Sequence, residues 1–458
     1  MTAARFAPCR RTAIAASHPR SPTGGPTHLT IDPSTPRLIV LMALSDVKLV
    51  GATAETVRQT VHSALFPSEP LDSITVKECS GRSGAAGFLL SKAGLPVIML
   101  KITGGSSLHT HPATSKRISA ATKVLREVNN APAMLLVGPD FYAEAAAGTS
   151  VMNDFFHFQD DCTGAEIASL LARFHATPTG WFKPLRGEYV ERDASVAPVL
   201  RAAPLHSQCW HLPWSGIDTG KVVMGMGNVP DEITQEVLRL QIDSGVWKKV
   251  MTCEAFYPVC EAAKRQVVIH GDFKPDNVLR GANGELIAID YDLCQVGPAV
   301  HEFGFMLMMW YGPRQTTYEY REAFVSAYLT ASGLESGTEV VREFMLDCEV
   351  NTLVTFPGLL ANIYDKEVPL LRGVPHPTAK ATAGSVDDSP TGLEIVDLLA
   401  AAVAQVRADA TLIERSVKDG LVPTLFAQKG LGSPLLFEWL QLMQANNMLR
   451  LFGIAPAE

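Results

Sequence analysis

The apolar positions divide the chain into a β-rich stretch and a longer helical stretch. Short apolar runs bounded by turn residues are typical of strands, and such runs cover residues 73–78, 88–92, 96–103, 134–137 and 141–145. Between the third and fourth runs, Ile118, Ala121 and Leu125 recur close to every 3.6 residues, which predicts a helix over residues 114–129. The first structured third of the chain is therefore predicted to be a small antiparallel sheet with one helix.

Helical periodicity dominates after Gly148. Further helices are predicted over residues 164–175, 231–242, 246–263, 393–416 and 435–451, with more helix from residue 302 onward. Two β segments interrupt them, at residues 266–270 and 277–289. A small β unit followed by a larger helical unit predicts an α+β fold of two lobes with a cleft between them.

Two segments, one N-terminal and one internal, differ in composition from the rest of the chain. Residues 1–45 hold five arginines and one acid, Asp32, among many Ser, Thr, Pro and Ala, which is typical of an organelle transit segment. A disordered extension, or a true start at Met42, would explain the same composition. The predicted organisation is an extension over 1–45, a β lobe over 46–147 and a helical lobe over 148–458. Residues 373–392, rich in Pro, Thr, Ser and Gly, are predicted to be a flexible insertion.

Composition excludes several classes of partner. The net charge is −8 and no basic stripe is present, so nucleic-acid binding is not expected. No apolar run approaches the roughly 18 residues of a membrane span. Eight cysteines without a CxxC pair favour reduced thiols and a reducing compartment. We expect a cytoplasmic protein, or a plastid or mitochondrial one if residues 1–45 are a transit segment.

The richest chemistry lies between residues 267 and 292. An apolar strand ends at His270-Gly-Asp272, Asn277 opens a second strand, and a third strand after a Gly-Ala-Asn-Gly turn ends at Asp290. Three oxygen-bearing side chains are thereby predicted at one edge of a hairpin. Phosphoryl transfer needs one carboxylate to orient or deprotonate a hydroxyl, and an amide and a second carboxylate to hold Mg²⁺ against nucleotide phosphates. The alternative is a β-hairpin whose polar residues only cap its turns.

The spacing resembles the signature of a known group of small-molecule kinases. Residues His270 to Asn277, followed by Ile289-Asp-Tyr-Asp292, match the pattern H-[GN]-D-x-x-x-x-N and I-D-[WYF]-[ED] of choline/ethanolamine kinases and aminoglycoside phosphotransferases. The resemblance extends over most of residues 75–365 and implies a protein-kinase-like fold. It also implies that Asp272 is the catalytic base and that Asn277 and Asp290 are the Mg²⁺ ligands. One departure is Glu302, which stands where the family usually has an aspartate.

The same resemblance implies an ATP site in the β lobe. The Gly-rich turn over residues 80–87 would lie against the phosphates, because Gly lets backbone N–H groups approach anionic oxygens. Lys101 would pair with the α and β phosphates, unless it is a solvated edge lysine. No acid stands at the helical position that should pair with Lys101, and Glu127 lies late in that helix. The predicted nucleotide-binding residues are Gly81, Ser83, Gly84, Lys101 and Glu144, the last in a hinge that receives adenine through its backbone.

The sequence defines the phosphorylated substrate less closely than it defines the ATP site. The resemblance implies a small-molecule alcohol, with choline or ethanolamine leading, and the predicted substrate residues are Asp292, Trp310, Tyr311 and Phe356. Both tryptophans of the family's W-G-L-W segment are missing, since this chain has Pro357-Gly-Leu-Leu360 there. An aminoglycoside-like phosphotransferase acting on another alcohol, and a pseudokinase that only binds nucleotide, stay open. A homodimer also stays open.

Overall fold

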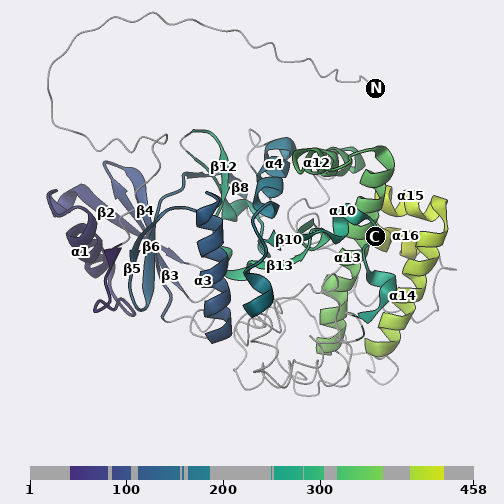
Figure 1. The fold of residues 1–458 in the computed structure, drawn as a ribbon, viewed down its shortest axis with the longest axis horizontal. Coiled ribbons are helices and arrows are strands. Elements are labelled where there is room, and N and C mark those ends of the chain that lie inside the picture. The colour runs from purple at the N-terminus through teal and green to yellow at the C-terminus, as the bar shows by residue number, and fades with distance from the viewer. Residues whose placement is uncertain are drawn as a thin grey trace, which may run out of the picture. The chain divides into compact units, whose positions relative to one another are not determined.

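The computed structural model describes most of the chain between residues 42 and 427. The described residues are 42–80, 85–104, 112–154, 157–158, 163–185, 249, 252–281, 283–303, 317–364 and 392–427. They form sheets and helices of an α+β fold (Figure 1), which confirms the predicted fold class. None of the helices in these ranges is long and apolar enough to cross a membrane.

The first part is a six-stranded sheet in the order β1-β5-β6-β4-β3-β2. Its strands are β1 (Met42–Ala43), β2 (Ile74–Ser80), β3 (Ala86–Lys92), β4 (Leu95–Ile102), β5 (Met134–Val137) and β6 (Phe141–Ala145). All neighbours pair antiparallel except β1, which runs parallel to β5. The predicted strands are confirmed, with β5 and β6 at the expected bounds.

Buried and less buried side chains alternate along β4, so one face of the strand packs on the core and the other carries Lys101. Ile98, Leu100 and Ile102 are buried, and they belong to one hydrophobic cluster with Val57 of helix α1 (Ala54–Leu65). Because successive strand residues point to opposite faces, Lys101 projects away from this cluster. The turn before β4 fixes the register, since Ala93 and Gly94 both have positive φ, at 48° and 78°, as a two-residue hairpin turn requires.

Two features of this part differ from the sequence prediction. Helix α1 lies between β1 and β2, where no helix was expected; its Val57 and Val61 are buried, and Ala54, Ala64 and Leu65 pack beside them against the core. Met42 and Ala43 fall in the predicted extension 1–45, yet they form β1 beside β5. Pairing with a strand more than 90 residues away is not visible in local composition.

The second part combines short strands with helices. Its strands are β7 (Thr149–Ser150), β8 (Met152–Asp154), β9 (His157–Phe158), β10 (Gln266–Ile269), β11 (Val278–Arg280), β12 (Leu286–Ala288) and β13 (Gln295–Pro298). Its α-helices are α4 (Gly164–His175), α10 (Glu261–Lys264), α12 (Tyr318–Ala331), α13 (Thr338–Tyr364), α14 (Gly392–Ala408), α15 (Ala410–Asp419) and α16 (Leu421–Ala427). Helix α4 has the predicted bounds and begins with a capping box between Thr163 and Glu166.

The predicted helix over residues 246–263 is only partly right in its described portion. Lys249 and Thr252 are helical, but residues 253–263 contain only the 3₁₀ turn η3 (Glu254–Phe256) and the start of α10. Pro258 cannot donate a helical hydrogen bond. The next two N–H groups, of Val259 and Cys260, are both 2.8 Å from Oδ2 of Asp347. A side chain of α13 therefore takes the donors that a continuous helix would use.

The predicted helix over residues 393–416 is two helices. Asp409 ends α14 and caps α15 by accepting from the N–H groups of Thr411 and Leu412, at 2.8 and 3.3 Å. The predicted helices 231–242 and 435–451 lie outside the described residues, as does nearly all of the predicted insertion, of which Gly392 alone is described as the first residue of α14.

Candidate active site

The segment after β10 is anchored by a buried histidine. His270 is fully buried, and its Nε2 lies 2.8 Å from the carbonyl oxygen of Ile289. Its Nδ1 is 3.3 Å from the backbone nitrogen of Asp272, which can only donate, so Nδ1 accepts and Nε2 carries the proton. His270 thereby ties the loop to the strand end that leads into Asp290. The contacts of His270 therefore give it a structural role in bracing the loop.

Glu302 holds the same loop from the other side. Its carboxylate accepts from the backbone nitrogens of His270 and Gly271, the latter at 3.2 Å. Burial opposes the charge of Glu302, but His175, His270 and the backbone donors lower its pKa overall. Gly271 has φ of 81°, a conformation that favours glycine. The Glu that departs from the family pattern is therefore a buried support for the loop.

Asp272 lies in a small polar cluster at the end of this loop. Its Oδ2 is 3.0 Å from Nζ of Lys274 and 3.0 Å from Nδ2 of Asn277, whose amide also donates to the Asp272 carbonyl at 2.8 Å. Burial raises the pKa of Asp272 to about 6, partly opposed by Lys274. The predicted pair Asp272 and Asn277 is thus brought together. Lys274 was not predicted, although its place two residues after Asp272 was visible in the motif.

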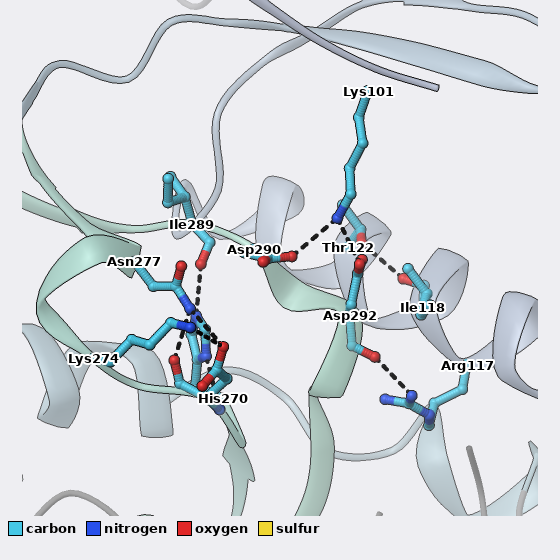
Figure 2. Close-up of polar contacts among 11 residues, drawn as sticks. Lys101, Arg117, Ile118, Thr122, His270, Lys274, Asn277, Ile289, Asp290 and Asp292 are labelled. Carbon is cyan, nitrogen blue, oxygen red and sulfur yellow. Dashed lines mark hydrogen bonds and ion pairs between the residues drawn. The ribbon is translucent and has the colours of Figure 1, made fainter. Parts of the chain in front are cut away.

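Asp290 and Asp292 meet Lys101 across more than 180 residues of sequence (Figure 2). Lys101 Nζ lies 3.0 Å from Oδ1 of Asp290 and 2.5 Å from Oδ2 of Asp292. Asp290 has φ of 65°, which is uncommon for a residue other than glycine and turns its carboxylate at the strand end. Burial opposes the charge of Lys101, yet the two aspartates raise its pKa well above its ordinary value. The β4 lysine is therefore a fixed cation at the hairpin edge.

Helix α3 (Pro112–Glu127) faces this cluster with a cation rather than an acid. The guanidinium of Arg117, which is 1% exposed, donates to the carbonyl oxygens of Cys294 and of Asp292, the latter at 2.7 Å. Glu127 is not the acidic partner of Lys101, because its side chain is 59% exposed and lies 3.9 Å from Lys123. Arg117 was not predicted as a site residue, although an arginine on the apolar face of that helix was a visible signal.

The other predicted site residues are placed as follows. The Glu144 side chain is 13% exposed and forms an ion pair with Arg126, so any contact with a ligand would come from its backbone. Residues Gly81, Ser83, Gly84, Trp310 and Tyr311 lie outside the described residues. Phe356 lies within α13, and its side chain is outside the described part.

Asp290 and Asn277 offer oxygen atoms of the kind that a metal could bind. Mg²⁺ prefers hard oxygen ligands and commonly uses one or two protein groups, with phosphate oxygens and waters completing its shell. Asp290 offers a carboxylate that is 39% exposed, and Asn277 donates through its nitrogen, which leaves its amide oxygen for a ligand. No cluster of three His, Cys, Asp or Glu side chains suited to a metal occurs in the described ranges. The residues therefore fit a metal held jointly with phosphates, not one enclosed by protein alone.

Comparison with solved structures finds low identity to several kinases. The choline kinase of Cryptosporidium parvum Iowa II is 15% identical with a TM-score of 0.46, over 83% of this chain and 99% of that chain. A Plasmodium vivax ethanolamine kinase is 10% identical with a TM-score of 0.42, over 69% and 83%. The APH(2")-IIa enzyme in a ternary complex with streptomycin and ATP is 12% identical with a TM-score of 0.38, over 70% and 95%. At 10–15% identity and TM-scores below 0.5, these structures do not identify a substrate for this chain.

Comparison by sequence is more specific. No curated protein matches the chain. Residues 157–344 match the model of a family described as "Phosphotransferase enzyme family", over less than half of the 458 residues. The matched span contains Asp272, Asn277 and Asp290, and it confirms the resemblance inferred from the motif. Over residues 157–344, the chain is therefore similar to the phosphotransferase enzyme family.

Proposed function

We propose that the protein is an ATP- and Mg²⁺-dependent kinase that transfers the γ-phosphoryl group to a hydroxyl of a small molecule. The observation that carries the proposal is the meeting of Lys101, Asp290 and Asp292 beside the loop that presents Asp272. Fixed cations, a metal-binding carboxylate and a poised base are the parts that phosphoryl transfer requires. The family match over the same loop supports it.

Each residue has a proposed role. Asp272 would accept the proton of the attacking hydroxyl, and the buried loop held by His270 and Glu302 would keep its carboxylate aimed. Asp290 and the Asn277 amide oxygen would hold Mg²⁺, which when bound neutralises charge on the phosphates. Lys101 would bind the α and β phosphates. Lys274, 3.0 Å from Asp272, would bind charge that develops on the transferring group.

Choline or ethanolamine is the leading substrate on the resemblance of the catalytic motif. An alcohol of another kind, such as an aminoglycoside-like polyol, is the second candidate, since the family's two tryptophans are absent at residues 357–360. The test is the purified protein with ATP, Mg²⁺ and a panel of choline, ethanolamine, sugar alcohols and aminoglycosides, with ³¹P NMR of the products. A new phosphomonoester with equimolar ADP supports the proposal. Nucleotide binding without turnover on any alcohol would favour the pseudokinase alternative.

The pKa of Asp272 predicts a pH profile. A general base acts only when ionised, and burial has raised its pKa from an ordinary 3.8 to about 6. Protonation below that value removes the base, so kcat/KM should fall about tenfold per pH unit below roughly pH 6 and level off above it. The rates should be measured from pH 5 to 8 with folding monitored by circular dichroism. A flat rate down to pH 5 would contradict this assignment.

A further inference from the structure

The two acids that contact Lys101 differ in their surroundings. The Asp292 side chain is 7% exposed and lies 2.5 Å from Nζ, whereas Asp290 is 39% exposed and lies 3.0 Å away. The Lys101–Asp292 ion pair should be the more persistent of the two, because it is shorter and because solvent screens a buried ion pair less. Asp290 can therefore release Lys101 and bind a cation, because Asp292 still compensates the positive charge of the lysine.

Helix α3 does not supply the acid that would otherwise position this lysine. Glu127 is its one acid, and that side chain is exposed beside Lys123. The helix instead presents Arg117, whose guanidinium donates to the carbonyl oxygens of Asp292 and Cys294. The helix thus binds the backbone of the turn and leaves the Asp292 carboxylate directed at Lys101 (Figure 2).

The turn that carries Asp292 is held from a second direction. It is the 3₁₀ turn η5 (Tyr291–Leu293), and the buried Tyr291 hydroxyl donates to the carbonyl oxygens of Ala288 and Asn130. Arg117 and Tyr291 together tie the turn to α3, to the residues after it and to the preceding strand β12. A carboxylate on such a support has a fixed position.

We propose that Asp292, rather than an acid on α3, is the residue that positions Lys101 for the nucleotide phosphates, and that Arg117 holds the turn that presents it. This inference rests on the proposed function and replaces the predicted substrate contact of Asp292. It makes Asp292 and Arg117 positioning residues. In this arrangement Arg117 of the helix holds the turn of Asp292, and Asp292 holds Lys101. Loss of Asp292 or of Arg117 therefore weakens the same contact between Lys101 and the phosphates.

The test is ADP affinity by calorimetry in EDTA, where no metal contributes. Lys101→Met and Asp292→Asn should each weaken ADP binding about tenfold, the scale of one desolvated charge contact. The double variant should bind no worse than Lys101→Met alone, since both changes remove one contact. Arg117→Lys, whose single ammonium cannot reach both carbonyls, should weaken binding severalfold only while Asp292 is present. Glu285→Gln, an exposed acid on the same hairpin, is the control and should bind ADP as the wild type does.

The outcomes separate this inference from the proposed function. If wild-type protein binds ADP and Asp292→Asn binds it equally well, the inference is overturned while the proposed function stands. Multiplicative losses in the double variant, or an Asp292→Asn effect confined to the KM of the alcohol, would also overturn it. If the wild type binds no ADP, the proposed function fails and the inference fails with it. Thermal unfolding of each variant distinguishes lost binding from lost folding.

Discussion

Asp272→Asn is expected to lower turnover by about a thousandfold or more while ATP affinity changes less than about threefold. A positioned general base contributes roughly 10²–10⁴ in rate, and the amide that replaces it cannot accept the proton. The replacement is close in shape, and its remaining oxygen can still accept from Lys274 or from Asn277. The loop should therefore keep its structure and the nucleotide its contacts.

The measurement is ADP release coupled to product analysis by ³¹P NMR, with ATP affinity determined separately. Asp276→Asn is the matched control, since it makes the same change four residues later in the same loop, where Asp276 lies 3.4 Å from Lys274. That variant should lose less than about tenfold in turnover. Residual activity of Asp272→Asn within tenfold of wild type would contradict the assignment of the base.

Glu302→Gln is expected to cost roughly 2–4 kcal/mol of folding free energy and at least tenfold in turnover. Glu302 accepts from two backbone nitrogens with its two oxygens, and its side chain is fully buried. Glutamine has one acceptor and one donor, so its amide nitrogen would face a backbone N–H. The buried donor left without a partner destabilises the loop that carries Asp272.

Urea unfolding followed by intrinsic fluorescence measures the first effect, and the kinase assay the second. Glu339→Gln makes the same change at an exposed position of α13 beside Arg342 and should leave the unfolding midpoint unchanged. A Glu302→Gln protein that unfolds at the wild-type urea concentration would show that the loop does not depend on this carboxylate.

Local signals in the sequence predicted much of the fold. Strands β5 and β6 and helix α4 were found at their bounds because each carries its own periodicity or turn residues within a few positions. Helix α1 was missed although Val57, Val61 and Leu65 recur at helical spacing and pack against the core of the sheet. The helix predicted over residues 246–263 is interrupted after Thr252, where the backbone N–H groups of Val259 and Cys260 donate to Asp347, nearly 90 residues away. Such capture of backbone donors has no local signature.

In the site, too, contacts that are local in sequence were predicted and long-range contacts were not. Asp272 and Asn277 were found together because five residues of one loop connect them, and that spacing is itself the motif. The contacts of Lys101 with Asp292 and of Arg117 with the Asp292 carbonyl span 191 and 175 residues. A sequence without its relatives does not reveal such pairs. The resemblance predicts a phosphate-binding role for Lys101, but the acid beside it became visible only in the structure.

Magnesium dependence of ATP affinity tests the central claim most directly. The claim is that Asp290 and Asn277 hold a metal against phosphates that Lys101 also binds. In wild-type protein, Mg²⁺ should tighten ATP binding at least about tenfold, and Asp290→Asn should remove that gain while metal-free ATP binds about as before. An equal Mg²⁺ effect in Asp290→Asn and wild type would contradict the claim.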